Sequence, residues 1–182
     1  MTPEINRDLY KIEMEQRAHL IEAAIVPILA ITVLCSGLLA MLLGFPYATG
    51  ALSVAFTAFA GTACVGVAVA IGAVFRAFIG YHYERPASPR NWQAYFDRLL
   101  AHYSGATGQL ALAKAALERA FHTRLSDATY TNRRNNRRRG NSIFLANLCC
   151  AGILAALVAS GICYALATIA QSPPLYAGGF FQ

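Results

Sequence analysis

The hydrophobic residues of the chain gather into three long runs, at residues 23–43, 51–75 and 143–170. A helix needs roughly 20 apolar residues to cross the hydrocarbon core of a bilayer, and each run reaches that length. Between the first two runs, the sequence GFPYATG at residues 44–50 combines Gly and Pro, which is typical of a turn. The pattern predicts a helical hairpin and, after a long polar interval, a third apolar helix.

Charged residues avoid these runs completely. No Asp, Glu, Lys or Arg occurs at residues 23–75 or 140–182, although the chain has 15 basic and 9 acidic residues. A water-soluble core of this size would carry charges on its exposed faces. We therefore predict an all-α integral membrane protein, with three transmembrane helices and a helical cytoplasmic segment between the second and the third. The first run is expected to be retained, because 22 residues of mixed charge precede it and no cleavage site follows.

The basic residues predict the orientation in the membrane. Twelve of them lie at residues 76–139, beside only four acidic residues, and the other three lie before residue 23. Because Lys and Arg accumulate in cytoplasmic loops, we expect the N-terminus inside the cell and the C-terminus in the periplasm of a bacterial inner membrane. The expected parts are a cytoplasmic N-terminal helix (1–22), a transmembrane hairpin (23–75), a basic cytoplasmic segment (76–141), a third transmembrane helix (142–170) and a periplasmic tail (171–182).

Five arginines stand within seven residues just before the third run: Arg133, Arg134, Arg137, Arg138 and Arg139. At this position they would block translocation and meet anionic headgroups, each contributing roughly 1 kcal/mol of attraction near the surface. An arm for nucleic acid would also be rich in Arg, but would more often lie away from a span and carry stacking aromatics. We favour contact with membrane lipids over nucleic acid, and leave open an acidic protein or a nucleotide as partner.

The cytoplasmic segment predicts two helices. Ser88 followed by Pro89 is a good helix start, with a hydroxyl at the N-cap and proline at the first helical position. The sequence SGATG at residues 104–108 predicts a break after this first helix. Apolar residues at spacings of four, three and four give the first helix one packing face: Trp92, Phe96, Leu99 and Tyr103.

The second helix has no evident stop before the third hydrophobic run. Residues 126–141 contain no proline, so the helix is free to continue into the bilayer, with Gly140 as its weak point. Asn132, Asn136 and Gly140 fall four apart and share one side of such a helix. We favour a solvated face there, and keep as the alternative that the asparagines pair with backbone or with a neighbouring subunit.

The N-terminal residues predict a further helix, which starts at residues 2–4 and merges with the first run, kinked by Pro27. Together with the two helices of the cytoplasmic segment it would form a three-helix cluster. Its main stripe consists of Ile5, Leu9, Ile12 and Gln16.

Small residues at four-residue spacing let helices approach closely in lipid. The second run has one such row and the third has two, which favours tight packing within the membrane and a homo-oligomer. The residues expected at these interfaces are Ala58, Thr62, Gly66 and Ala70 in the second run and Gly152, Ala156 and Ser160 in the third.

Residues for catalysis or cofactor binding are not evident. The hydrophobic runs hold no ionisable Asp, Glu, Lys, Arg or His, which argues against a proton-coupled or sodium-coupled transporter. The five cysteines all lie within these runs and behave there as small apolar residues. The four histidines show no metal-ligand spacing. We therefore expect no catalytic residue, no metal and no cofactor.

A scatter of positions, together with the layout, carries a resemblance. The positions are Tyr81, His82, Tyr83, Pro86, Ser88, Pro89, Trp92, Tyr95, Ala128, Thr129, Asn132, Asn136 and Arg139. The chain resembles small bacterial inner-membrane proteins found beside anti-phage defence genes, such as the two-span SLATT-type effectors, from which its third span departs. The resemblance implies an effector that associates in the inner membrane and disturbs it when a cytoplasmic partner signals infection.

Two functions follow as expectations. The first is a pore-forming or membrane-perturbing oligomer, a channel-like effector of antiviral defence controlled by its cytoplasmic segment. The alternative is a non-enzymatic membrane anchor or adaptor, whose basic segment recruits an acidic protein, a nucleotide or a nucleic acid.

Overall fold

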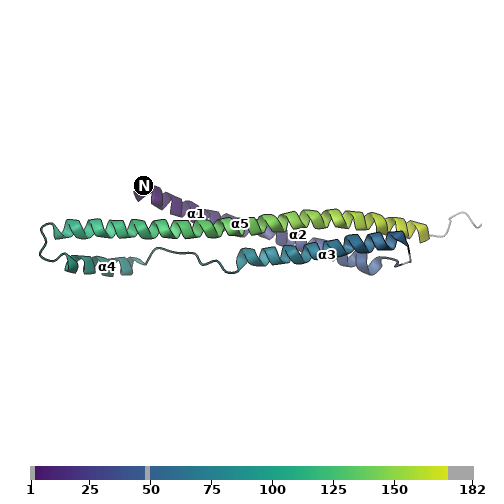
Figure 1. The fold of residues 1–182 in the computed structure, drawn as a ribbon, viewed down its shortest axis with the longest axis horizontal. Helices are drawn as coiled ribbons and strands as arrows, with labels where there is room; N and C mark the ends of the chain where they lie inside the picture. Colours follow the sequence, from purple (N-terminus) through teal and green to yellow (C-terminus); the bar gives the residue numbers. More distant parts are fainter. Residues whose placement is uncertain (1–2, 48–49, 172–182) are drawn as a thin grey trace, which may run out of the picture. The chain divides into compact units, whose positions relative to one another are not determined.

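The structure, a computed structural model, describes residues 3–47 and 50–171, and its regular secondary structure there is all helical, without strands. Five helices follow one another along the sequence (Figure 1). They are α1 (Pro3–Ala23), α2 (Ile25–Gly44), α3 (Ala51–Phe78), α4 (Pro89–His102) and α5 (Gln109–Gln171). Most of the expected C-terminal tail, 172–182, lies outside the described residues, as do two residues of the predicted turn, 48 and 49.

Within the described part of the chain, three helical stretches are long and apolar enough to cross a membrane: Glu4–Gly44, Ala51–Phe78 and Gln109–Gln171. The prediction of an all-α chain with three helices of transmembrane length and composition is confirmed. The contacts divide the chain into two compact units. We call Met1–Glu22 with Phe78–Gly140 the polar unit, and Ala23–Ala77 with Asn141–Gln182 the apolar unit.

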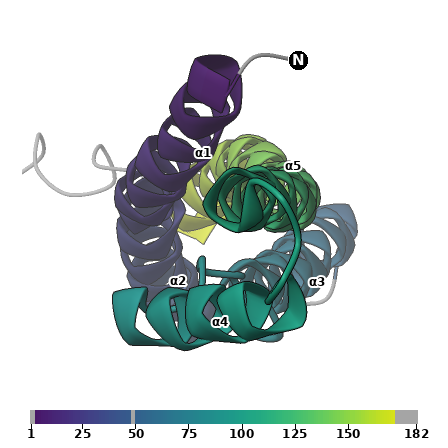
Figure 2. The same ribbon diagram turned by 90° about the vertical axis from the view of Figure 1, so that its left-hand side faces the viewer.

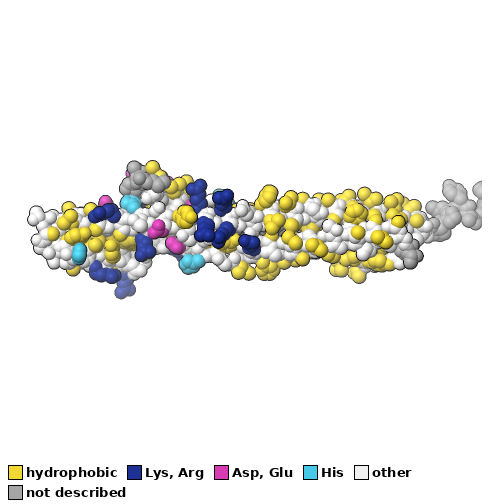
Figure 3. Space-filling view, viewed as in Figure 1, with side chains coloured by type: hydrophobic (Ala, Val, Ile, Leu, Met, Phe, Trp, Pro, Cys, Tyr) yellow, Lys and Arg dark blue, Asp and Glu magenta, His cyan; other side chains and the backbone are white. Residues whose placement is uncertain are grey.

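The apolar unit packs α2, α3 and the C-terminal part of α5 around small residues. Alanines from α3, among them Ala60, Ala63 and Ala70, are buried at its centre, where Phe56 is also fully buried. Its outer surface is densely hydrophobic (Figure 3), with large side chains such as Val33 and Phe75 exposed. An apolar surface of this extent is typical of helices that face lipid.

An aromatic cluster holds the end of the hairpin where α2 turns into α3. The rings of Phe45 and Phe56 stack with centroids 3.8 Å apart. Tyr47 packs edge-on against Phe45 and donates its hydroxyl to the Leu42 carbonyl at 2.8 Å. The carbonyl of Leu42 belongs to the last turn of α2, so this hydrogen bond satisfies a group that the helix itself leaves without a partner.

The polar unit is built from α1, α4 and the N-terminal part of α5. In Figures 1 and 2, α1 and α4 lie on different sides of α5. Arg7 of α1 lies 5.7 Å from the ring centre of Phe121 in α5, and Trp92 of α4 packs edge-on against the same ring at 5.3 Å. The three helices expected to form a cluster therefore meet at Phe121.

The boundaries of α4 follow the predicted signals. Ser88 is the N-cap and accepts a hydrogen bond from the Asn91 amide, and Pro89 occupies the first turn. The predicted break falls between His102 and Gln109, where Gly105 and Gly108 have φ of 85° and 78°. These left-handed angles favour glycine. After the break α5 runs for 63 residues without interruption, so Gly140 does not end the helix.

Candidate functional site

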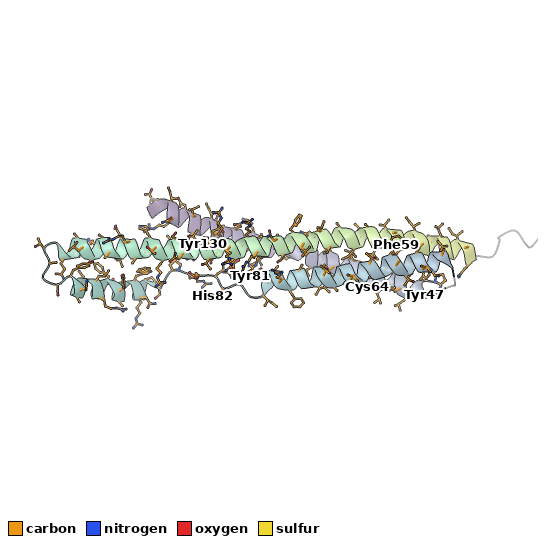
Figure 4. The ribbon with its side chains drawn as sticks, in the orientation of Figure 1. Tyr47, Phe59, Cys64, Tyr81, His82 and Tyr130 are labelled. Atoms are coloured by element: carbon orange, nitrogen blue, oxygen red, sulfur yellow. The ribbon has the colours of Figure 1, made fainter. Side chains whose placement is uncertain are left out.

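The connection from α3 to α4, residues 79–88, is extended and contains no helix. Gly80 has a φ of 89°, which ends α3, and Pro86 cannot supply a helical amide hydrogen bond. An extended segment that packs against protein must satisfy its backbone N–H and C=O groups with partners other than its own. The connection, which bears Tyr81 and His82 in Figure 4, finds those partners on α5.

Asn132 binds this connection with both ends of its amide. Its Oδ1 accepts a hydrogen bond from the Glu84 backbone N–H at 3.0 Å, and its Nδ2 donates to the Glu84 carbonyl at 3.1 Å. The side chain of Asn132 is fully buried. Asn132 thus pairs with both backbone groups of Glu84, as a residue of a neighbouring β-strand would.

Asn135 and Asn136 extend the contact. Asn135 donates to the His82 carbonyl at 2.7 Å. Asn136 accepts from the Tyr83 hydroxyl at 2.7 Å and donates to both the carbonyl (2.7 Å) and the carboxylate (2.9 Å) of Glu13 in α1. We call Asn132, Asn135 and Asn136, with the groups they bind on residues 82–84 and on Glu13, the asparagine clamp. It ties three separate segments of the polar unit together.

The solvated face that we favoured for Asn132 and Asn136 is therefore wrong. Asn132 is 0% exposed and Asn136 is 1% exposed. Their partners are main-chain and side-chain groups of the same chain, so the alternative of pairing with backbone is confirmed. The third residue of this row, Gly140, packs against Leu20 of α1, whose Cδ2 would lie 3.7 Å from a Cβ at that position.

Arginine guanidinium groups lie over the tyrosines beside the clamp. Arg17 lies 4.4 Å from the centre of the Tyr83 ring, and Arg139 lies 5.5 Å from the centres of both Tyr81 and Tyr83. Such cation–π contacts contribute about 0.5–2 kcal/mol, more when water is excluded. Arg139 is buried, whereas Arg133, Arg134, Arg137 and Arg138 are exposed. The structure thus separates one member of the predicted arginine set from the other four.

Burial also controls the acid–base behaviour of Tyr83. Desolvation raises the pKa of its hydroxyl above the ordinary value of about 10, and the neighbouring Arg139 and Arg17 offset part of this rise. The Tyr83 hydroxyl is therefore protonated over the physiological range, as its role as hydrogen-bond donor to Asn136 requires. Glu13 is buried as well, and its carboxylate lies 4.0 Å from the Nε of Arg133.

The predicted face of α4 is only half-buried. Trp92, Phe96, Leu99 and Tyr103 all retain some exposure, and no residue of α4 is fully buried. Trp92 contacts Tyr95 within the helix and Phe121 of α5. On α5, Ala113 and Leu125 are buried.

The small residues of the apolar unit fall into two groups. Ala70, Ala156 and Ser160 are buried within the chain. Gly66 meets Ile153, because a Cβ at Gly66 would lie 2.7 Å from the Ile153 Cγ1. The remaining predicted interface residues, Ala58, Thr62 and Gly152, are exposed on the surface of this unit.

Sequence reasoning missed Glu13, Arg17 and Tyr83 as members of this site. The sequence carried no signal for Glu13: the expected stripe contained Ile5 and Ile12, which are exposed, whereas the inward face of α1 contains buried Glu13 and half-buried Arg17. No cluster of three potential metal ligands occurs among residues 3–47 and 50–171. All five cysteines are free thiols.

Comparisons with protein-family models, with curated proteins and with solved structures found no match to this chain.

Proposed function

We propose that the protein is an oligomeric membrane protein of the bacterial inner membrane, which perturbs or permeabilises the bilayer under the control of its polar unit. In this proposal the polar unit is cytoplasmic and the apolar unit is embedded in lipid. The protein acts on the membrane itself and not on a chemical substrate. A role in anti-phage defence would suit such an activity.

The observation that carries the proposal is the continuity of α5. This one helix of 63 residues bears the asparagine clamp in its first half and the third apolar run in its second. An event that releases or tightens the clamp acts directly on a helix that also enters the membrane. Buried polar networks of this kind hold one arrangement when fully paired and lose it when a partner is removed.

The surface of the apolar unit supports assembly. Ala58 and Thr62 are exposed on α3, and nothing lies within 4 Å of a Cβ built at Gly61 or Gly72 of the same helix. Small residues on a lipid-facing helix allow a second copy to approach closely. A pore lined by such helices would contain Ser, Thr and apolar groups, and would open by wetting and not by charge selection.

Dye release from liposomes tests the proposal. Purified wild-type protein and the double variant Asn132→Ala/Asn136→Ala are reconstituted at equal density, with Asn141→Ala as the control for an exposed asparagine of α5. We expect the double variant to change the release rate at least severalfold relative to both the wild type and the control. Equal release from all three proteins, with insertion verified, would show that the asparagine clamp does not control membrane permeability.

A second candidate function is a membrane anchor that recruits an acidic partner. It is favoured by the exposure of Arg133, Arg134, Arg137 and Arg138 along two turns of α5. Replacing these four with Gln should abolish recovery of such a partner in a pull-down, provided that membrane insertion is unchanged. The same partner recovered with the variant would exclude this candidate. Nucleic acid is the least favoured partner, since Tyr130 is the one aromatic residue among positions 126–142.

A further inference from the structure

A groove in the polar unit collects arginines from three different segments. It has a volume of about 660 Å³ and lies where the connection after α3 meets α4 and α5. Arg85 comes from the connection, Arg98 from α4 and Arg124 from α5. The polar unit carries many Lys and Arg side chains on the face drawn in Figure 3, but these three share one concave site.

The positive charge of the groove is not balanced within the described chain. Its lining contains one carboxylate, that of Glu84, against the three guanidinium groups. Among the described residues no ion pair involves Arg85, Arg98 or Arg124, and the Nε of Arg98 donates only to the Ala94 carbonyl of its own helix. Like charges gathered at one site repel each other unless a counter-charge is present. A bound anion would supply that counter-charge.

The chemistry of the lining selects the class of anion. Guanidinium groups bind phosphate oxygens through paired, charge-assisted hydrogen bonds, because their planar donors match the geometry of the phosphate. Asn91 and Tyr95 add polar groups to the same wall. The volume lies within the range of pockets that hold small molecules. We propose that this groove binds a multiply charged phosphate group, carried either by a soluble phosphate ester or by a lipid headgroup.

The groove adjoins the asparagine clamp through a single residue. Glu84 lines the groove, and its backbone is held by Asn132 at both N–H and C=O. Arg85 is the next residue in the chain. A phosphate bound to Arg85 therefore changes the position of the residue next to the segment that the asparagine clamp holds, residues 82–84. The ligand thereby regulates the clamp. This regulatory role rests on the proposed function, whereas the binding site does not.

Calorimetry with pyrophosphate as the probe tests the binding site. The full chain is placed in nanodiscs of phosphatidylcholine, and the triple variant Arg85→Gln/Arg98→Gln/Arg124→Gln is compared with the matched control Arg90→Gln/Arg119→Gln/Arg134→Gln. Each set removes three positive charges, but none of the control residues lines the groove. We expect pyrophosphate affinity to fall about tenfold or more in the first variant and less than about twofold in the control. An equal fall in pyrophosphate affinity in both variants, or no pyrophosphate binding by the wild type, would contradict the proposed phosphate site.

A second pair of variants guards against loss of folding. Ala87 is an exposed residue of the groove wall, so Ala87→Asp adds a carboxylate without removing a contact, and Ala87→Asn is its uncharged counterpart. Weaker pyrophosphate binding by the Asp variant alone supports the site, and identical binding by both variants contradicts it. Nanodiscs that contain phosphatidic acid, whose phosphomonoester is multiply charged, then separate the two sources, with the singly charged phosphodiester phosphatidylglycerol as the control for surface charge. Competition with pyrophosphate supports a lipid headgroup as ligand, and undiminished binding supports a soluble phosphate ester.

The two experiments test the phosphate site and the proposed function independently. Pyrophosphate binding without any dye release would support the phosphate site and contradict the proposed function. Dye release by a wild-type protein that does not bind pyrophosphate would exclude the groove as a phosphate site and leave the proposed function standing.

Discussion

Asn136 binds Glu13 twice, donating one amide hydrogen to its carbonyl at 2.7 Å and the other to its carboxylate at 2.9 Å. The two residues are 123 positions apart in the chain, and both are buried. Because Asn136 also accepts from the Tyr83 hydroxyl, one amide joins α1, α5 and the connection between α3 and α4. A buried amide with three good partners fixes one arrangement of these segments, since every other arrangement leaves a polar group without a partner.

Removing this amide should destabilise the polar unit strongly. In Asn136→Ala, the carboxylate of Glu13 and the hydroxyl of Tyr83 lose a buried partner, which costs about 1–3 kcal/mol for each group left unsatisfied. We expect a loss of about 3 kcal/mol in the free energy of unfolding, measured by urea denaturation of the full chain in detergent micelles. The exposed Asn141 provides the control, and Asn141→Ala should change stability by less than about 0.5 kcal/mol. Similar values for the two variants would show that the clamp contributes little.

Tyr83→Phe separates the hydroxyl from the ring. The phenyl ring keeps its contacts with Arg17 and Arg139, while the hydrogen bond to Asn136 Oδ1 is lost. The expected cost is about 1 kcal/mol, smaller than that of Asn136→Ala, because the ring keeps its contacts and only one acceptor loses its donor. Tyr83→Leu removes the cation–π contacts too and should cost more. The same denaturation experiment orders the three variants, and a Phe variant as unstable as the Leu variant would contradict this division.

The raised pKa of Tyr83 predicts weakening of the clamp at alkaline pH. The folded state favours the protonated hydroxyl, so its contribution to stability is complete below the unfolded pKa of about 10 and is lost as the pH rises through the higher folded value. An absorbance titration of tyrosinate near 295 nm should show a late step above pH 10 in the folded wild type that the urea-unfolded chain lacks. Tyr83→Phe should erase that late step. A late step that survives the substitution would assign it to another tyrosine.

A close contact in the apolar unit predicts opposite effects for two glycines of α3. A Cβ at Gly66 would lie 2.7 Å from the Ile153 Cγ1, whereas nothing lies within 4 Å of a Cβ at Gly61. Gly66→Ala must displace Ile153 and should lower stability by about 1–2 kcal/mol. Gly61→Ala should be neutral or stabilising, because alanine favours the helix by about 1 kcal/mol. Thermal unfolding in detergent distinguishes the two, and equal midpoints would contradict the packing of α3 on α5.

The proposed oligomer predicts that exposed small residues of α3 form the contact between two copies of the chain. In Ala58→Leu/Thr62→Leu the added bulk should prevent close approach of a second copy and lower the mass of the detergent-solubilised particle. Cys64, which is also exposed (labelled in Figure 4), is the control position, because two residues along a helix from Thr62 it lies on the other side of α3. Light scattering should give an unchanged mass for Cys64→Leu. A wild-type particle that already has the mass of a single chain would exclude the oligomer.

Local sequence patterns predicted the helices and their boundaries well. Long uncharged runs indicated three helices able to span a membrane, and Ser88 with Pro89 marked the start of α4. The absence of proline at residues 126–141 allowed α5 to continue through Gly140. Each of these features depends on residues close together in the chain, where helix length, capping and backbone freedom decide the outcome.

The clamp could not be predicted in the same way. The spacing of Asn132 and Asn136 is the same whether they face water or protein, and their partners lie 48 to 123 residues away. The stripe of Ile5 and Ile12 was the obvious packing face of α1, yet the helix turns Glu13 inward because Asn136 offers it two hydrogen bonds. Which face of α1 packs inward is therefore decided by a contact between segments that lie far apart in the sequence.

Membrane topology underlies the proposed function and can be measured directly. A reporter inserted at Gly105, in the exposed turn between α4 and α5, places the test within the polar unit. With the polar unit in the cytoplasm, a green fluorescent reporter there should be bright and alkaline phosphatase should be inactive, while the chain resists extraction from membranes at alkaline pH. Active phosphatase at Gly105, or release of the chain into the soluble fraction, would contradict the account.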